Sequence, residues 1–204
     1  MESKKQMLKI ALTGGLAAGK TLAAKTLADL GAYIIDADIV AREVTAEPEV
    51  ADRIRQAFGE RYFDKDGKLN RRKLGKYVFA DPQRVKLLNS LLHPLIKQKI
   101  QDQLDCLQLP VVFVVAPLLI ESGMVDMFDR VWTIASKPEI RIKRAIRRDN
   151  ISRRRAYNIL RNQATEQQRA EIASVVINNE DGEDEFIAQI KNHYRDLTRE
   201  LGLT

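Results

Sequence analysis

The sequence predicts an α/β protein, folded as a three-layer α/β/α sandwich around a parallel sheet. Three observations support this fold class: strand-like and helix-like segments alternate along the chain, the first of them form a βαβ unit, and one central strand is apolar almost throughout. A βαβ unit sets its two strands parallel, because the helix returns the chain to the same end of the sheet. An apolar central strand fits such a sheet, since helices cover both of its faces.

The βαβ unit begins near the N-terminus. Residues 8–13 (LKIALT) have the composition of a short buried strand, and residues 19–30 carry apolar side chains at helical spacing up to Gly31, a helix-ending residue. The segment AYIIDAD predicts a second strand that ends in two carboxylates, Asp36 and Asp38. A glycine-rich loop therefore joins the first strand to the helix.

The remaining strands are expected in the second half of the chain. The run PVVFVVAPLLI, which begins at Pro110, predicts the central strand, and shorter strands are expected at 129–135 and 173–179. The chain between those two is basic and reads as helical, and an amphipathic helix closes the sequence. The region 39–105 also reads as mostly helical.

The composition is that of a globular protein with an adequate core. The chain has 204 residues, 45% hydrophobic and 30% charged, and a domain of this length buries roughly 70% of the surface that its unfolded chain exposes. No stretch approaches the ~20 consecutive apolar residues of a membrane span, and the apolar run after the basic start is too short for a signal segment. We therefore expect a cytoplasmic protein. Cys106 is the single cysteine, which excludes an internal disulfide, and we expect it to be a buried small hydrophobic residue.

The glycine-rich loop matches a phosphate-binding pattern. Gly14-x-x-x-x-Gly19-Lys20-Thr21 stands between a strand and a helix, the context that a P-loop requires. Glycine lets successive N–H groups turn inward around an anion, and the N-terminus of the following helix attracts negative charge. Lys20 is expected to reach the β- and γ-phosphates of ATP, and the Thr21 hydroxyl to bind Mg²⁺. The predicted ATP-binding residues of the loop are Gly14, Gly15, Leu16, Ala17, Ala18, Gly19, Lys20 and Thr21.

The positions of the carboxylates distinguish among P-loop enzymes. The central apolar strand runs into Ala116 and Pro117 without the Asp that holds Mg²⁺ in motor and switch NTPases, and no guanine-recognition motif is present. Asp36 instead follows the second strand, and the carboxyl ends of parallel strands face the ligand crevice. We therefore expect Asp36 to accept a proton from an acceptor hydroxyl. Asp38 is the alternative base, or else caps a helix that begins near Ile39. The arrangement predicts a small-molecule kinase.

Positive charge is concentrated in one segment. Between Lys137 and Arg161 stand ten lysines and arginines against two acids, in a chain of net charge +6. Arg144 and Arg148 share a helix face there and are expected to clamp the transferring phosphates. A nucleic-acid-binding NTP-dependent module is the alternative, but Tyr157 is the only ring in the segment and stacking platforms need several. We expect a small-molecule substrate, with neither nucleic acid nor membrane as a partner.

Several further blocks resemble one family. After the P-loop come IIDADIVAR, FG, DGKLNRRKLGKYVF, RVKLLNSLLHPLI, PLLIE, IKRAIRRD, RNQ and VINN, in the order in which dephospho-coenzyme A kinases have them, ending at residue 179. The Asp-Ala-Asp, His-Pro and Pro-Leu-Leu-x-Glu blocks are specific to that family. The resemblance implies ATP-dependent phosphorylation of the 3′-hydroxyl of dephospho-coenzyme A, the last step of coenzyme A synthesis.

The resemblance also implies roles for parts of the chain. It implies a nucleotide-binding core at about 7–38, 110–136 and 170–204, a helical substrate-binding subdomain at about 39–105, and a lid at about 137–168. Lys20, Asp36 and Arg144 would be catalytic, with Asp36 as the general base, and ATP and Mg²⁺ would be required. The residues expected around the acceptor are Asp36, Arg42, His93, Pro94, Leu118 and Glu121.

The sequence departs from the family at two places. The usual Ile-Gly-Ser-Gly-Lys-Ser loop reads Leu-Ala-Ala-Gly-Lys-Thr here, so Ala17 replaces a glycine. Ala17 must then accept a backbone conformation that L-residues disfavour, or the loop must differ slightly. Ser174 replaces an Asp before the last strand. Another small-molecule or nucleoside-monophosphate-type kinase remains the alternative function, because the P-loop itself does not specify the acceptor.

Overall fold

The computed structural model describes residues 7–203, which divide into two compact units. The first unit holds the chain up to Asp36 and again from Gln108 onward, and the second holds Ala37–Leu107.

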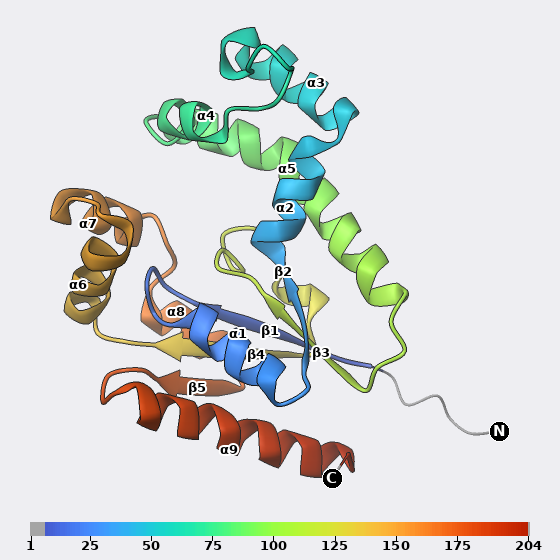
Figure 1. Cartoon of the computed structure of the whole chain (residues 1–204), viewed down its shortest axis with the longest axis vertical. Coiled ribbons are helices and arrows are strands. Elements are labelled where there is room, and N and C mark those ends of the chain that lie inside the picture. Colours follow the sequence, from blue (N-terminus) through green and yellow to red (C-terminus); the bar gives the residue numbers. More distant parts are fainter. Residues whose placement is uncertain (1–6, 204) are drawn as a thin grey trace. The chain divides into compact units, whose positions relative to one another are not determined.

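The first unit is built on a parallel sheet. Across the described residues, five strands pair in the order β2-β3-β1-β4-β5, and every pairing is parallel (Figure 1). The strands are β1 (Leu8–Gly14), β2 (Tyr33–Asp36), β3 (Val111–Val115), β4 (Arg130–Ala135) and β5 (Val175–Asn178). With helices packed against it, this sheet confirms the predicted α/β fold class.

Alternating side chains of the strands build the core. Ile10 and Leu12 of β1, Phe113 of β3 and Trp132 of β4 share one buried cluster with the helices α1 (Lys20–Asp29) and α9 (Glu183–Leu201). The rings of Phe113 and Trp132 meet edge to face at a centroid distance of 5.0 Å, a favoured aromatic geometry. The short helix α8 (Glu166–Ile172) packs against β1 and β4 from behind the sheet (Figure 1). The sheet is thus covered on both faces.

The first helix ends where the sequence predicts. Gly31 has φ 91°, and its N–H donates to Ala28 O at 2.9 Å while Ala32 N donates to Leu27 O at 3.0 Å. This pair of bonds is a Schellman motif, in which a left-handed residue after the helix satisfies its last carbonyls. Glycine occupies that residue without the strain that a side chain would cause.

The basic segment forms separate helices. α6 (Pro138–Asp149) ends at Asn150, which has φ 49°, and α7 (Arg153–Arg161) starts after Ser152, whose hydroxyl accepts from Arg155 N. Ile142, Ala145 and Ala156 form a small apolar cluster between these helices. The next helix along the chain is α8, and a capping box at Thr165 and Gln168 fixes its start.

The second unit is helical. It contains α2 (Ala37–Ala46), α3 (Pro48–Phe58), α4 (Arg71–Val78) and α5 (Pro82–Asp105), with a short 3₁₀ turn at Glu60–Tyr62. Buried Val44, Ile54, Leu74 and Leu104 come from the four helices and supply apolar contacts. Asp81 caps α5 by accepting the N–H of Gln83 at 2.8 Å.

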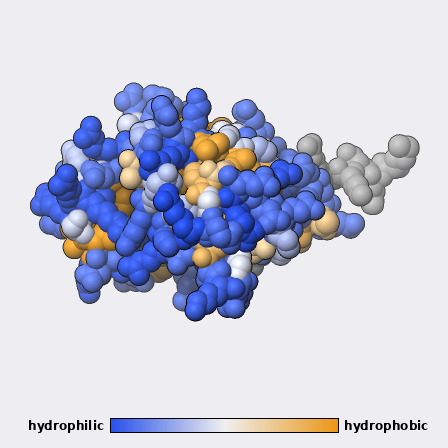
Figure 2. Space-filling view, turned by 90° about the horizontal axis from the view of Figure 1, so that it is seen from above, coloured by the Kyte–Doolittle hydropathy of each residue, from blue (hydrophilic) through white to orange (hydrophobic). Residues whose placement is uncertain are grey.

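Cys106 is exposed, so the prediction that it is buried is wrong: it follows the last residue of α5, beyond the buried Leu104. Within residues 7–203, no helix has the length and apolar character to cross a membrane. On the face drawn in Figure 2, hydrophilic residues predominate and hydrophobic ones form small areas between them.

Candidate active site

The predicted phosphate loop lies at the carboxyl end of β1. Gly14 is the last residue of that strand and α1 begins at Lys20, so the loop has the strand–loop–helix geometry that the motif requires. The Lys20 ammonium donates to Gly14 O at 2.7 Å and to Gly15 O at 2.9 Å. Thr21 is exposed on the first turn of α1. The loop therefore places a cation, a hydroxyl and a helix N-terminus together, where an anion is favoured.

Ala17 adopts the backbone conformation that L-residues disfavour, the first of the two possibilities that the sequence left open. Its φ is 53°, in the left-handed region, which costs an L-residue roughly 1–2 kcal/mol. Its side chain, with that of Leu16, packs against the small cluster of Ile142, Ala145 and Ala156. The loop thus keeps the backbone path that a glycine would take, while the methyl group of Ala17 packs against the apolar cluster between α6 and α7.

Replacing Ala17 with glycine will raise the free energy of unfolding by about 0.5–1 kcal/mol, because relief of left-handed strain exceeds the entropy cost of glycine. Urea denaturation measures the difference. Ala24→Gly in the regular part of α1 is the control and should lose about 1 kcal/mol, as glycine does inside a helix. A loss of similar size for both variants would contradict the strain at Ala17.

Asp36 lies at the same edge of the sheet as the loop. It is the last residue of β2 and pairs with Val115 of β3, which in turn pairs with Leu12 of β1. Two strand spacings of about 4.8 Å therefore separate Asp36 from β1 at its carboxyl end. Asp38 lies in the first turn of α2, which begins at Ala37. The prediction that Asp38 precedes a helix starting near Ile39 is wrong, because the helix follows the strand directly.

Arg144 and Arg148, predicted as a clamp, have different partners. Arg144 is half-buried, and its NH1 and NH2 donate to the backbone O and the Oδ1 of Asn179 at 3.0 and 3.1 Å. Arg148 is exposed and makes two hydrogen bonds to the carboxylate of its neighbour Asp149, at 2.8 and 2.9 Å. These bonds raise the pKa of Arg148 and lower that of Asp149. The structure thus holds Arg144 toward the loop through Asn179, and Arg148 toward Asp149.

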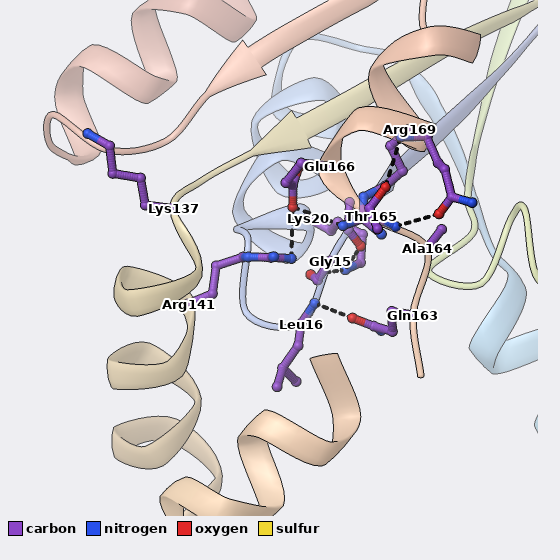
Figure 3. A network of polar contacts seen from close by, with 12 residues as sticks. Gly15, Leu16, Lys20, Lys137, Arg141, Gln163, Ala164, Thr165, Glu166 and Arg169 are labelled. Atoms are coloured by element: carbon purple, nitrogen blue, oxygen red, sulfur yellow. Dashed lines mark hydrogen bonds and ion pairs between the residues drawn. The ribbon is translucent and has the colours of Figure 1, made fainter. Parts of the chain in front are cut away.

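Glu121 and Leu118 lie in the turn after β3. Glu121 Oε1 accepts the backbone N–H of Ala164 at 2.7 Å, and Leu118 is 44% exposed. Gln163, the residue before Ala164, accepts the N–H of Leu16 at 2.8 Å (Figure 3). The segment before α8 is therefore tied both to the phosphate loop and to the turn after β3.

A family-wide sequence model described as dephospho-CoA kinase matches residues 8–185. The chain belongs to the dephospho-CoA kinase family. A dephospho-CoA kinase of Shigella flexneri is 39% identical over 196 residues, 94% of this chain and 95% of that protein. This membership confirms the resemblance found in the sequence, and with it the predicted activity: an ATP-dependent kinase of coenzyme A biosynthesis that acts on dephospho-CoA.

Solved structures share this fold, and one of them is a dephospho-CoA kinase. A protein from Thermus thermophilus superposes with a TM-score of 0.83 at 29% identity, over 95% of this chain and all (100%) of that one. Dephospho-CoA kinase from Campylobacter jejuni superposes with a TM-score of 0.71 at 26% identity, over 94% of this chain and 97% of that one. The likeness extends over both units of the chain.

The second unit contains three of the six residues that the dephospho-CoA kinase resemblance assigns to the acceptor: Arg42, His93 and Pro94. Arg42 is exposed on α2, and its carbonyl accepts from Arg71 NH2 at 2.8 Å. His93 is half-buried in α5, where burial, with a smaller contribution from Lys97, lowers its pKa. Pro94 follows it inside the helix and lacks the N–H that would bond back one turn. Arg42 and His93–Pro94 thus stand on α2 and α5, which pack together.

The sequence did not predict the buried ion cluster that lies next to the phosphate loop. Arg141 and Arg169, whose side chains are 5% and 3% exposed, both pair with Glu166 Oε1, at 2.8 and 2.9 Å (Figure 3). A Cβ at Gly15 would overlap the Arg141 guanidinium, so glycine is needed there for space. Arg141 NH1 makes no directed hydrogen bond within the described residues, and burial lowers the pKa of this guanidinium, an effect that Glu166 opposes and Arg169 adds to. One carboxylate therefore compensates two buried cations.

Replacing Glu166 with glutamine will destabilise the fold by about 3 kcal/mol, because breaking a buried ion pair leaves uncompensated charge. Glu171→Gln, an exposed change on the same helix, should stay within about 0.5 kcal/mol of the native chain. Chemical denaturation of both variants measures the difference. Equal stabilities for the two would show that the cluster needs no counter-charge.

Proposed function

We propose that this chain transfers the γ-phosphoryl group of ATP to the 3′-hydroxyl of dephospho-coenzyme A, yielding coenzyme A and ADP. The observation that carries the proposal is the joint position of the phosphate loop and Asp36 at one edge of the sheet. Family membership supports the acceptor, and this geometry supports the roles of the residues.

The loop binds the donor. Its N–H groups and the N-terminus of α1 surround the phosphates, and Lys20 exchanges its bonds to Gly14 O and Gly15 O for bonds to phosphate oxygens. Phosphoryl transfer needs positioning and charge neutralisation more than covalent chemistry. Lys20 and Arg144 supply positive charge to the equatorial oxygens of the transferring group.

Thr21 is the proposed protein ligand of Mg²⁺. Its hydroxyl is a hard oxygen donor next to Lys20 on an exposed turn, and Mg²⁺ is usually held by few protein oxygens together with phosphates and water. The residues therefore fit the ion, although no group of three or more His, Cys, Asp or Glu side chains that would hold a metal occurs within residues 7–203. When bound, Mg²⁺ neutralises phosphate charge.

Asp36 is the proposed general base. Its carboxylate orients the 3′-hydroxyl and takes its proton as the oxygen attacks the γ-phosphorus. Asp38 lies two residues further on, inside α2, and is not needed for this step.

The acceptor-binding residues are also proposed. Exposed Arg42 suits the phosphate groups of the acceptor, and His93 with Pro94 and exposed Leu118 offer surfaces for its less polar parts. Glu121 acts by holding the Ala164 N–H, and thereby the segment that contacts the loop. ATP-dependent synthesis of a coenzyme fits a cytoplasmic location, a small-molecule partner and no nucleic acid.

The test is a panel of acceptors. Purified protein with ATP and Mg²⁺ should release ADP with dephospho-coenzyme A, and far less with AMP, nucleosides or gluconate. Release with AMP that exceeds release with dephospho-coenzyme A would favour the alternative, a nucleoside-monophosphate kinase. ADP at background level with dephospho-coenzyme A would refute the proposal.

A further inference from the structure

Asn179 connects α6 to the phosphate loop. Its Nδ2 donates to Ala18 O in the loop at 2.7 Å, its Oδ1 accepts from Arg144 NH2 at 3.1 Å, and its carbonyl accepts from Arg144 NH1 at 3.0 Å. The residue is 6% exposed. One buried amide therefore holds a loop carbonyl and, at the same time, the guanidinium of α6.

The sheet fixes Asn179 itself. Asn179 N donates to Ala135 O at the end of β4 at 2.9 Å. Before it, Asn178 exchanges two hydrogen bonds with the amide of Gln189 on α9, at 3.2 and 3.0 Å. After it, Glu180 pairs with the Lys137 ammonium at 2.8 Å and accepts the Lys137 N–H at 2.9 Å, just before α6 starts. The backbone around Asn179 is thus hydrogen-bonded to β4, to α9 and to Lys137, the residue before α6.

The loop is shaped to admit this side chain. A Cβ at Gly19 would overlap Asn179 Nδ2 and would lie 3.2 Å from Phe186 Cε1. Gly19 also has φ 117°, so the position is closed to other residues by space and by conformation. The close approach of Asn179 is therefore built into the loop.

The chemistry of the two bonds requires an amide. Asparagine donates and accepts at once, whereas an aspartate of the same shape only accepts and an alanine does neither. Aspartate would keep an acceptor for Arg144 but would face Ala18 O with a second oxygen. The two links can therefore be separated experimentally.

We propose that Asn179 is a positioning residue for phosphoryl transfer, which sets the Arg144 guanidinium at a fixed place relative to the phosphate loop. The proposal rests on the role proposed above for Arg144. It makes a specific prediction, because a residue that acts through Arg144 has nothing left to position once Arg144 is gone.

The experiment is a double-mutant cycle on the full chain, with steady-state kinetics on ATP and dephospho-coenzyme A. Asn179→Ala should lower kcat by about 10–100-fold, since a shift of about 1 Å in a catalytic group costs up to about 10²-fold. In the Arg144→Ala background the same change should leave kcat within about twofold. The effect on the KM for ATP should persist in both backgrounds, because the bond to Ala18 O is lost in each.

Two further variants make the cycle decisive. Asn179→Asp should keep more of kcat than Asn179→Ala while raising the KM for ATP. Because aspartate has nearly the shape of asparagine, this variant tests the proposal if the alanine variant does not fold. Asn178→Ala, an exposed change next door, is the matched control with native kinetics.

Two results would overturn the proposal: the same factor in kcat for Asn179→Ala with and without Arg144, or a kcat within twofold of native for Asn179→Ala alone. A merely structural residue would give the first of these, with a lower melting temperature. The rate of the native chain, measured in the same assay, reports separately on the proposed function.

Discussion

Lys20→Ala will lower kcat/KM for ATP by at least about 10³-fold, the scale on which one cation acts in phosphoryl transfer. The physical reason is that the Lys20 ammonium, held at Gly14 O and Gly15 O, is the loop's own positive charge. Its loss weakens the interactions with ATP in both the ground state and the transition state, so KM should rise and kcat should fall. Initial rates of ADP formation across ATP concentrations measure the change.

Lys25→Ala is the matched control for that variant. Lys25 lies on the same helix and is exposed. Its replacement by alanine removes the same net charge as Lys20→Ala. Its kinetics should match those of the native chain. If Lys20→Ala lost no more activity than Lys25→Ala, the loop would not be the donor site.

Asp36→Asn will fold and bind ATP, but its kcat will fall by roughly 10²–10⁴-fold, the contribution of a positioned general base. Asparagine keeps the shape at the end of β2 but does not take the proton of the acceptor hydroxyl. Calorimetric binding of ATP and steady-state turnover, measured on the same preparation, separate the two effects.

Asp38→Asn separates the two candidate bases. Because Asp38 lies in the first turn of α2, we expect the variant to retain most of its turnover while it loses the favourable interaction of a carboxylate with a helix N-terminus. A larger loss for Asp38→Asn than for Asp36→Asn would reassign the base.

The elements were predictable because their signals are local. The apolar run after Pro110, the loop between β1 and α1, and Gly31 at the end of α1 each reflect the conformational preference of a few adjacent residues. The boundaries were less predictable. β2 ends at Asp36 and α2 begins at Ala37 with no connecting turn. Because no helix-breaking residue marks this junction, the start of α2 was predicted near Ile39 and Asp38 was placed before the helix.

The contacts around the loop were beyond the reach of local patterns. Asn179 and Gln163 stood in blocks that the family resemblance singled out, yet their partners, Ala18 and Leu16, lie far away in the sequence. Arg141 is one of the ten basic residues between Lys137 and Arg161, but its guanidinium is buried against Glu166 of α8. Which of many basic side chains turns inward depends on tertiary packing, and one sequence does not record it.

The most direct test uses two deoxy analogues of the acceptor. With ATP and Mg²⁺, the native chain should release ADP with 2′-deoxy-dephospho-coenzyme A but not with the 3′-deoxy analogue, which lacks the hydroxyl that Asp36 is proposed to deprotonate. Phosphorus NMR of the 2′-deoxy product should show one new phosphate monoester on the 3′-oxygen. Equal release of ADP with both analogues would contradict transfer to the 3′-hydroxyl and the account of the site built on it.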